Sequence, residues 1–257
     1  MFEPRLAAAS LSGESDADWA KQAAPHVGCA FLGGIALDSA TREAAREMVD
    51  RERTEFLPED PIAFIDEQLT ALESADVRAA FNVRSATLEP IAEAAAVCAD
   101  HDAILEINAH CRQEEMCAAG AGQSLLRDGD RLCEQVATAA DAGADVSVKV
   151  RTEVEGVDLP ALSARLADAG ADALHVDAMD SEPVVAEVAE AAPETFLIAN
   201  NGVRDRATAY EYLEYGADAV SVGRPSDNPT VLRRIREAVD EWFTTGDRLD
   251  PEVSPDA

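Results

Sequence analysis

The sequence places a thiol and an amine at positions that favour chemistry over packing alone. Cys111 lies in the segment EINAHCRQEEMC, directly after a short apolar stretch, and Lys149 lies inside the apolar run SVKVRT. A thiol can donate a proton near neutral pH. A buried ammonium can stabilise an anion or form a Schiff base. For Lys149 the structural alternative is a buried ion pair with Glu106 or Asp177.

Two loops have the composition of phosphate-binding turns. Asn200, Asn201 and Gly202 come straight after an apolar run and straight before a helical pattern, and Gly223-Arg224 follows the next apolar run. Turns of this kind expose backbone N–H groups, and a guanidinium adds a bidentate donor. The alternative is that these glycines only turn the chain.

Other polar side chains also end apolar runs. They include amides, imidazoles and guanidinia, which are the groups that bind cofactors and substrates: Asn82, Arg84, Asn108, His110, Arg151, His175 and Asp177. Free cysteines are more often buried packing residues, and we expect this of Cys29, Cys98 and Cys133, with Cys117 ambiguous.

Eight short apolar runs alternate with longer stretches that have apolar residues at a spacing of three to four, which predicts alternating strands and helices. The strands are expected at Arg5–Ser10, Val27–Leu32, Val77–Val83, Ala103–Asn108, Asp145–Arg151, Asp172–Asp177, Thr195–Asn200 and Asp218–Gly223. Helices are expected at Asp38–Arg51, Pro61–Glu73, Leu88–Ala99, Asp130–Ala142, Leu159–Ala169, Glu182–Ala192, Arg206–Tyr215 and Pro229–Phe243.

This order predicts an α/β fold, a single-domain (β/α)8 TIM barrel over residues 1–245, followed by an acidic, disordered tail at 246–257. The repeated sequences DAGADVSVKV, DAGADALHVD and EYGADAVSVG each predict a helix end, a left-handed glycine and a buried strand. These turns mark the amino end of the barrel, which in such folds serves stability and not catalysis. The polar strand ends therefore belong to the opposite, carboxyl end, where barrels of this kind have their active sites.

The chain is strongly acidic, with a formal net charge of −30 and 21 basic residues in 257. An acidic, lysine-poor surface stays hydrated in concentrated salt, which predicts a halophilic source. No signal-like start and no apolar run of about 20 residues is present, so a cytoplasmic location and no membrane contact are expected. The five cysteines include no Cys-x-x-Cys pair, so the sequence does not predict a metal site.

Four segments resemble, in order, motifs of the tRNA-dihydrouridine synthases. EINAHCRQEEMCAAGAGQSLL is similar to that family's Asp-Ile-Asn-x-Gly-Cys-Pro, Gly-Ala-Gly and Leu-Leu. SVKVRT resembles its Val-Lys-hydrophobic-Arg, IANNGVRD its Ile-Ala-Asn-Gly-Asp-Ile, and VSVGRP its Met-Ile-Gly-Arg. The resemblance extends from about Val77 to Arg236, and it is to a short, archaeal-type relative that lacks the family's C-terminal helical domain.

The resemblance implies an FMN-dependent oxidoreductase that reduces a uracil-type C=C bond by hydride from reduced flavin, with NAD(P)H as the electron donor. Cys111 would be the general acid and Lys149 would act at the edge of the flavin and substrate. The implied cofactor-binding residues are Asn82, Asn108, Lys149, His175, Asn200, Asn201, Gly202, Gly223 and Arg224. The implied partner is tRNA or a small pyrimidine.

The match has two departures. The family's His-Gly-Arg after the sixth strand is Asp177-Ala178-Met179 here, so either Asp177 or His175 would take the place of its histidine. The family's Gly-Cys-Pro is His110-Cys111-Arg112.

Two other functions remain open. One is a flavin-free, phosphate-binding lyase or isomerase that uses Lys149 as an amine, and the other is a non-catalytic flavin-binding subunit. An oligomer is compatible with all three interpretations.

Overall fold

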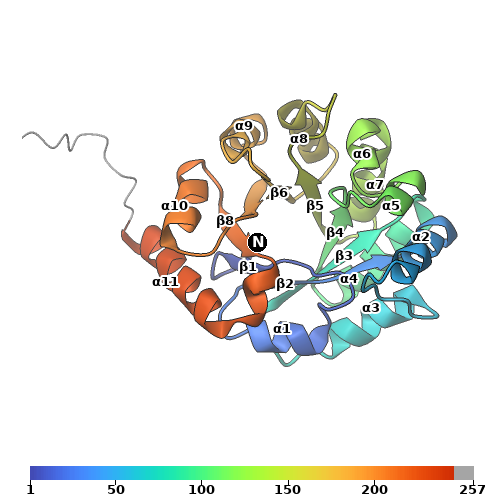
Figure 1. Ribbon diagram of the computed structural model, residues 1–257, viewed down its shortest axis with the longest axis horizontal. Coiled ribbons are helices and arrows are strands. Elements are labelled where there is room, and N and C mark those ends of the chain that lie inside the picture. The colour runs from blue at the N-terminus through green and yellow to red at the C-terminus, as the bar shows by residue number, and fades with distance from the viewer. Residues whose placement is uncertain (246–257) are drawn as a thin grey trace, which may run out of the picture.

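The computed structural model describes residues 1–245, so the predicted tail at 246–257 lies outside the described residues. Eight parallel strands form a closed ring in chain order, with β1 paired to both β2 and β8. Figure 1 shows this ring in the middle of the molecule with the helices outside it, which confirms the predicted TIM barrel. The strands are β1 Leu6–Ala8, β2 Cys29–Ala36, β3 Arg78–Arg84, β4 Ile104–Asn108, β5 Asp145–Arg151, β6 Ala173–Asp177, β7 Phe196–Asn200 and β8 Ala219–Val222.

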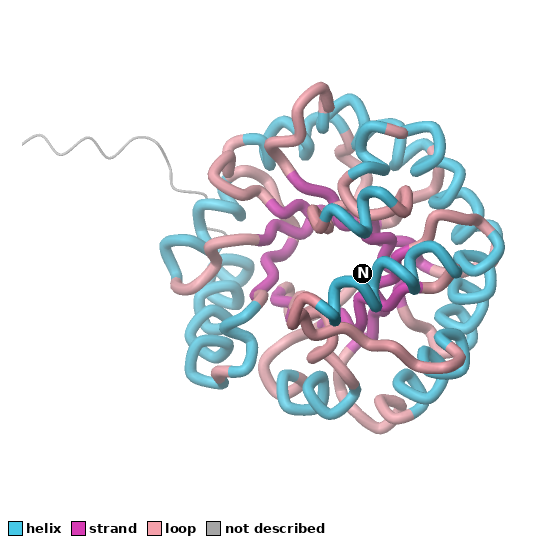
Figure 2. The backbone as a smooth tube through the Cα atoms, turned by 45° about the vertical axis from the view of Figure 1, so that its right-hand side comes forward, coloured by secondary structure: helices cyan, strands magenta, loops and turns pink. Residues whose placement is uncertain are grey.

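The helices form an outer layer around the strands (Figure 2). Those that match predicted segments are α2 Ser39–Asp50, α3 Pro61–Thr70, α4 Glu89–Asp100, α7 Gly129–Asp141, α8 Leu159–Asp168, α9 Val184–Ala191, α10 Arg206–Glu214 and α11 Pro229–Thr245. None of the helices within residues 1–245 is long and apolar enough to cross a membrane.

Four short helical segments were not predicted: α1 Ala17–Ala23, α5 Glu114–Ala118, α6 Ser124–Arg127 and the 3-10 turn η1 Arg224–Asp227. The residues that α1 buries fully are all alanines, so no large apolar side chain marks its inner face in the sequence. The Asp16 carboxylate caps it by accepting a hydrogen bond from Trp19 N at 2.9 Å. The other three segments have only four or five residues, too few to show a helical period.

The predicted end of the second strand was wrong. Gly33 and Gly34 do not follow β2 but lie within it, where the register to β3 shifts between Gly33 and Ile35. Gly33 has φ +89°, and a Cβ there would lie 2.5 Å from the Asn82 carbonyl oxygen. The glycines therefore let the strand continue through a bulge past its neighbour.

The predicted Gly-Ala-Asp turns are confirmed at the amino ends of the strands. Gly143, Gly170 and Gly216 have φ of 93°, 106° and 93°. Two of the aspartates also bind the preceding strand: Asp172 accepts from Val146 N at 2.8 Å, and Asp218 accepts from Leu197 N at 2.9 Å. These turns fix the amino end of the barrel and leave the carboxyl end for polar side chains.

The apolar core has two parts. The larger part lies between the strands and the helices, and the smaller one fills the inside of the barrel at its amino end. Phe2 belongs to this inner cluster and packs edge-on against Phe196 at 5.2 Å between ring centroids. The N-terminus accordingly lies at the centre of the ring in Figure 1. The inner cluster closes the amino end of the barrel.

Candidate active site

A cavity of about 1010 Å³ lies at the carboxyl ends of the strands. This is the end at which barrels of this architecture have their active sites. Its walls come from the loops after β1, β2, β4, β7 and β8 and from the last residues of the strands. They include Ser10, Arg53, Arg84, Asn108, His110, Cys111, Arg112, Lys149, Arg151, Asp177, Asn200, Asn201, Gly202, Arg204, Ser221, Gly223 and Arg224.

The inner side of the barrel changes character along the strands. On β4, Ile104 belongs to the apolar cluster at the amino end, Glu106 is two residues further on, and Asn108 lines the cavity. Successive residues of a strand alternate between its two faces, so these three side chains point inward. A polar layer thus lies directly beneath the cavity, where TIM barrels more often have branched apolar residues.

One half of this polar layer connects the Cys111 loop to Glu106. The Cys111 backbone N–H donates to Asn108 Oδ1 at 3.0 Å, and Asn108 Nδ2 donates to Asn82 Oδ1 at 2.8 Å. Asn82 Nδ2 in turn donates to Glu106 Oε1 at 2.7 Å. The position of the loop that bears the thiol is thereby tied to a carboxylate in the centre of the barrel.

The other half connects β7 and β8 to the same carboxylate. Asn200 Nδ2 donates to Ser221 Oγ at 2.6 Å, which lies 2.7 Å from His175 Nε2. His175 Nδ1 lies 2.6 Å from Glu106 Oε2, and Ser147 Oγ donates to the same oxygen at 3.3 Å. Because Glu106 can only accept, the network assigns the His175 proton to Nδ1 and the Ser221 proton to the bond with Nε2.

The electrostatics of the layer agree with that assignment. Burial alone would raise the pKa of Glu106, but the neighbouring His175, Lys149 and Asn82 hold it at about 2. Burial lowers the pKa of His175, although Glu106 opposes the shift. The centre of the barrel therefore contains an ionised carboxylate and a neutral imidazole at pH 7.

Lys149 extends from β5 into the cavity wall. Its side chain is 3% exposed, and its ammonium makes no hydrogen bond or ion pair with any residue in the described range. The predicted structural alternative, a direct ion pair with Glu106 or Asp177, is therefore absent from the described contacts. Both carboxylates are near enough for Lys149 to lower their pKa values. A buried ammonium with unused donors is suited to an anionic or carbonyl ligand.

Asp177 and His110 form a second titratable pair in the wall. His110 Nδ1 lies 3.5 Å from Asp177 Oδ2, and Asn201 Nδ2 donates to Asp177 Oδ1 at 3.1 Å. Burial lowers the pKa of His110, and Lys149 lowers it further, against the effect of Asp177. For Asp177, burial would raise the pKa, but His110 and Lys149 lower it. Of the two candidates for the place after the sixth strand, Asp177 lines the cavity and His175 lies beneath it.

Backbone contacts with the segment around Gly122 and Gln123 fix the position of the Cys111 loop. The Cys111 carbonyl accepts from Gln123 N at 2.8 Å, and a Cβ at Gly122, which has φ +62°, would lie 2.3 Å from that carbonyl oxygen. Cys111 and Cys117 are half-buried, whereas Cys29 and Cys98 are buried as predicted. The prediction that Cys133 is buried was wrong, because Cys133, on α7, is only half-buried, like Cys111 and Cys117.

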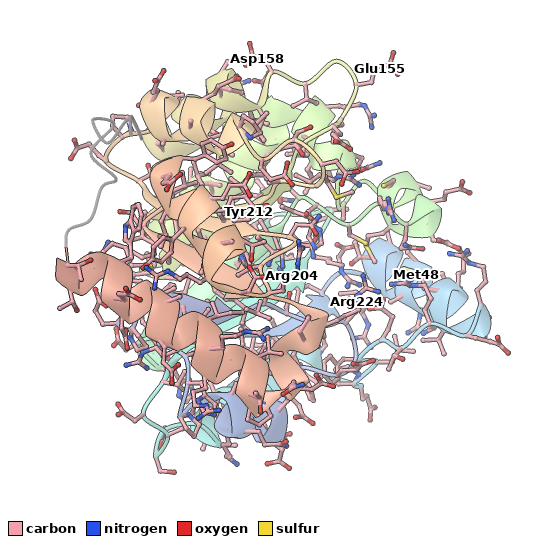
Figure 3. The ribbon with its side chains drawn as sticks, turned by 60° about the vertical axis from the view of Figure 1, so that its left-hand side comes forward. Met48, Glu155, Asp158, Arg204, Tyr212 and Arg224 are labelled. Atoms are coloured by element: carbon pink, nitrogen blue, oxygen red, sulfur yellow. The ribbon has the colours of Figure 1, made fainter. Side chains whose placement is uncertain are left out.

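The loops after β7 and β8 form the opposite wall, since β8 and β4 lie across the ring from each other. Asn201 and Gly202 have φ of 91° and 67°, and the Tyr212 hydroxyl donates to the Asn201 carbonyl at 2.9 Å. A Cβ at Gly223 would meet no atom within 4 Å. Arg204 and Arg224 line the cavity here, on the side of the molecule where α10 and α11 lie (Figure 3).

Most of the predicted site residues come together. Cys111, Lys149, Asn108, Asn200, Asn201, Gly202, Gly223 and Arg224 all line the cavity. Asn82 and His175, which were predicted to contact a cofactor, are fully buried in the layer below and do not line it. The prediction did not include Arg53 and Arg204 among the cavity residues. Arg204 was detectable, because it follows Gly202 by two residues in the same turn.

Comparison with known proteins agrees with this barrel and cavity. The family model "Dihydrouridine synthase (Dus)" matches residues 36–247. The chain therefore belongs to the dihydrouridine synthase family.

Two relatives show how far the similarity extends. An uncharacterized protein of Methanocaldococcus jannaschii is 28% identical over 234 residues, which cover 87% of this chain and 89% of that protein. The tRNA-dihydrouridine synthase B of Xanthomonas campestris pv. campestris is 28% identical over 186 residues, 66% of this chain and 55% of that enzyme. The matched region thus spans about half the length of the named enzyme.

Solved structures share the fold at low identity. DHODH from Eimeria tenella, in complex with ferulenol, superposes with a TM-score of 0.68 at 14% identity, covering 94% of this chain and 82% of that one. Thiamine phosphate pyrophosphorylase from Pyrococcus furiosus gives a TM-score of 0.55 at 11% identity, covering 92% and 96%. These likenesses concern the barrel only.

Proposed function

We propose that the protein is an FMN-dependent oxidoreductase of the dihydrouridine synthase type that reduces a pyrimidine C=C bond. The observation that supports this most directly is the content of one cavity. It contains a buried ammonium at Lys149 that is unpaired among residues 1–245, a half-buried thiol at Cys111 and two open turns after β7 and β8. These are the parts that such a reduction needs: a cation for an anionic ring, a proton donor and a phosphate site.

The cavity fits a phosphate-bearing ligand. The space around Gly223 admits a ligand close to the backbone, and Gly202, in its left-handed conformation, brings a second turn to the same wall. Arg204 and Arg224 would bind the phosphate together with these turns. Lys149 and Asn108 would bind the polar edge of the ring system. The chemistry that reduced FMN would supply at this site is hydride transfer.

The protein's own residues would supply the proton. Cys111 would protonate the substrate carbon next to the one that receives hydride. The bond from its backbone N–H to Asn108 Oδ1 would keep the thiol at the cavity wall. His110 is neutral at pH 7, so it would act as a hydrogen-bond donor or acceptor rather than as a charge. Asn82 and His175 would act from below by fixing Asn108 and Glu106.

The charge of the cavity supports an anionic substrate. In a chain of net charge −30, the cavity is lined by more basic than acidic residues. The basic ones are Arg53, Arg84, Arg112, Lys149, Arg151, Arg204 and Arg224, against Glu14, Glu52 and Asp177. We accordingly propose a nucleotide-containing substrate, tRNA or a small pyrimidine nucleotide, with NAD(P)H as electron donor.

The first test is binding of FMN. Titration of the purified protein with FMN in high salt should quench flavin fluorescence with saturation. Lys149→Met and Arg224→Met should each weaken binding about ten-fold or more, whereas Lys21→Met, far from the cavity, should not. A protein that takes up no FMN would contradict the proposal.

The second test concerns the substrate. Deleting the gene should lower the dihydrouridine content of tRNA if tRNA is reduced. Expressing the Cys111→Ala variant in the deletion strain should not restore the dihydrouridine content. Unchanged tRNA would leave the small pyrimidine as the substrate, to be assayed by loss of uracil absorbance.

The unpaired state of Lys149 also favours one alternative, a Schiff-base lyase or isomerase. Borohydride trapping of a carbonyl substrate on Lys149, in protein that binds no flavin, would favour it. A non-catalytic flavin-binding subunit would instead bind FMN and show no loss of any activity in Cys111→Ala.

A further inference from the structure

His110 and Asp177 face each other at the carboxyl end of the barrel. His110 Nδ1 lies 3.5 Å from Asp177 Oδ2, and among residues 1–245 no other carboxylate lies within 4 Å of the nitrogens of this ring. Both residues line the cavity. They belong to the two segments that depart from the family motifs: an imidazole replaces the glycine before Cys111, and a carboxylate replaces the histidine at the end of β6. The two departures therefore meet in one pair.

The neighbours of Asp177 direct its carboxylate towards His110. Asp177 ends β6, where it is the register partner of Arg151 on β5. Its Oδ1 accepts a hydrogen bond from Asn201 Nδ2 at 3.1 Å, which leaves Oδ2 for His110. Asn201 has a left-handed backbone with φ +91°, a conformation that asparagine tolerates better than most residues. The turn after β7 thus holds the carboxylate in place.

The backbone of His110 is fixed as well. The N–H of Ala109 donates to the Lys149 carbonyl at 2.8 Å, and the N–H of His110 donates to Asn108 Oδ1 at 3.3 Å. Asn108 and Lys149 are register partners on β4 and β5. His110 therefore leaves β4 beside the strand position from which Lys149 lines the cavity.

A comparison with His175 distinguishes His110 from a packing histidine. His175 is fully buried, and both of its nitrogens have partners, Glu106 at 2.6 Å and Ser221 at 2.7 Å. The His110 side chain is 28% exposed, and its Nε2 has no hydrogen-bond partner among residues 1–245. Because the ring lines the cavity, its unused nitrogen is accessible to a ligand.

The ionisation of Asp177 determines which nitrogen of His110 has the proton. Burial would raise the pKa of Asp177, but His110, Lys149 and the Met179 backbone lower it below its usual value, so the carboxylate is ionised at pH 7. An ionised carboxylate can only accept, which assigns the His110 proton to Nδ1. Burial lowers the pKa of His110 to about 4, against the effect of Asp177. Nε2 therefore keeps its lone pair at neutral pH.

We propose that His110, oriented by Asp177, is the hydrogen-bond acceptor with which the cavity binds the N–H of a cyclic imide. Lys149 donates to the carbonyl beside that N–H, so that the two side chains present an acceptor next to a donor. An imide, which is an N–H between two carbonyls, has the complementary order. His110 is then a specificity-determining residue, and Asp177 is a positioning residue that acts through it.

Two rings of the proposed function contain this group, the pyrimidine end of the flavin and a uracil. A cytosine has an acceptor nitrogen where a uracil has the N–H, so the same pair of side chains rejects it. That such a ring enters the cavity rests on the proposed function.

The first measurement is the tautomer of His110. In protein labelled with ¹⁵N-histidine, two-bond ¹H–¹⁵N correlations at pH 7 should show a proton on Nδ1 of His110 and none on Nε2. Asp177→Asn removes the negative charge at almost constant shape and should raise the Nε2–H population. His101, which follows α4 and contacts Asp66, is the internal reference and should not change. A wild-type His110 protonated on Nε2 would overturn the inference.

The second measurement is binding of the imide. The probes are FMN with the free protein and uridine 5′-monophosphate with the FMN-loaded protein, each compared with its analogue methylated at the imide nitrogen. For the ring that His110 binds, wild type should prefer the N–H form about ten-fold or more. Asp177→Asn should weaken binding of the N–H form about five-fold and leave the methylated form unchanged. His110→Phe, which keeps an aromatic ring without nitrogens, should abolish the preference.

The two probes distinguish the flavin from the substrate. A preference for the N–H form of FMN identifies the flavin as the ring that His110 binds, and a preference for the N–H form of the uridine nucleotide identifies the substrate. No preference with either probe would overturn the inference.

A double-variant cycle separates positioning from direct contact. Because Asp177 acts through His110, Asp177→Asn should have no further effect on N–H binding once His110→Phe is present. Additive losses would overturn the roles assigned to the pair. Asp180→Asn, an exposed carboxylate in the same loop that does not line the cavity, should change neither binding nor tautomer.

The tautomer of His110 is measured without flavin or substrate, which separates this inference from the proposed function. A protein that binds FMN and shows no preference for an imide N–H would overturn the inference and leave the proposed function intact. A protein with the His110 proton on Nδ1 that binds neither FMN nor uridine 5′-monophosphate would contradict the proposed function, and the imide ligand with it.

Discussion

At the scale of single residues, Glu106 is the centre of the site although it does not line the cavity. Its two oxygens accept from Asn82, Ser147 and His175, and its side chain is fully buried. An isosteric amide has only one accepting oxygen, and its NH2 group would face a donor. The carboxylate is therefore specified by its neighbours and not only by its size.

We expect Glu106→Gln to destabilise the protein by about 3 kcal/mol at pH 7, because it leaves a buried donor unpaired. Urea denaturation followed by circular dichroism measures this change. Glu93→Gln, on the exposed side of α4, should change the free energy of unfolding by less than about 0.5 kcal/mol. Equal effects of the two substitutions would contradict the role assigned to Glu106.

The sign of the pH dependence follows from the shifts. The pKa of Glu106 is lowered to about 2 from its usual 4.5. The unfolded chain therefore binds this proton first, and the stability that Glu106 contributes is present above pH 4.5 and lost as the pH falls towards 2. The lowered pKa values of His110 and His175 reduce stability already at higher pH. As the pH falls below 6.5, the imidazoles of the unfolded chain take up protons while the folded ones stay neutral, so the free energy of unfolding decreases.

This can be checked by NMR, since the chain has four histidines. We expect the ring signals of His110 to titrate near pH 4 and those of His175 to titrate below the usual pH of an imidazole. Assignment by His110→Gln and His26→Gln identifies the resonances. An ordinary titration of His110 would show that its imidazole is open to water.

At the scale of elements, the segment between β4 and α7 controls where the thiol lies. Gly122 combines a left-handed backbone with close contact to the Cys111 carbonyl, whereas Gly156, with φ +80°, has nothing within 4 Å of its Cβ position. A methyl group is therefore strained at both sites but collides with backbone at only one.

Gly122→Ala should accordingly destabilise the protein by at least about 2 kcal/mol, against about 1 kcal/mol for Gly156→Ala. Thermal unfolding compares the two, and the alkylation rate of Cys111 should change only in Gly122→Ala. Similar losses in both variants would mean that backbone conformation alone matters at Gly122.

The elements also show what sequence reasoning can reach. Apolar periodicity and the Gly-Ala-Asp turns were sufficient for all eight strands and for the end of the barrel that bears the site. Alternation along β5 separates Lys149 from Val148 and Val150, which lie on the other face of the strand. Alternation gives the face of a strand on which a side chain lies but not its depth in the barrel. It therefore could not show that Asn82 and His175 lie below the cavity while Asn108 and Asp177 line it. The bulge at Gly33 and the contact between Arg84 and Glu55 depend on long-range packing that no local pattern records.

At the scale of the whole molecule, charge is distributed unevenly. The cavity is lined mainly by basic residues, while the chain as a whole has 51 acidic residues against 21 basic ones. Self-repulsion of this size destabilises the compact state. It is screened over about 10 Å in 0.1 M salt but over about 3 Å in 1 M salt.

We expect the melting temperature to rise between 0.1 and 2 M KCl, by about 10 °C or more, because screening relieves repulsion in the folded state more than in the extended chain. Differential scanning calorimetry measures it. A flat or falling curve would contradict this expectation, and with it the prediction of a halophilic source.

The hydrogen bonds beneath the cavity have one further property, which is their direction. From Cys111 through Asn108 and Asn82, and from Asn200 through Ser221 and His175, every proton is donated towards Glu106. Turning over the Asn82 amide would place its oxygen against the carboxylate of Glu106 and its NH2 against the NH2 of Asn108. Because the chain begins at a backbone N–H, which can only donate, and ends at a carboxylate, which can only accept, neither amide can reverse. The thiol loop and the turn after β7, both at the carboxyl end of the barrel, are thus connected through Glu106 by two chains of hydrogen bonds whose direction is fixed.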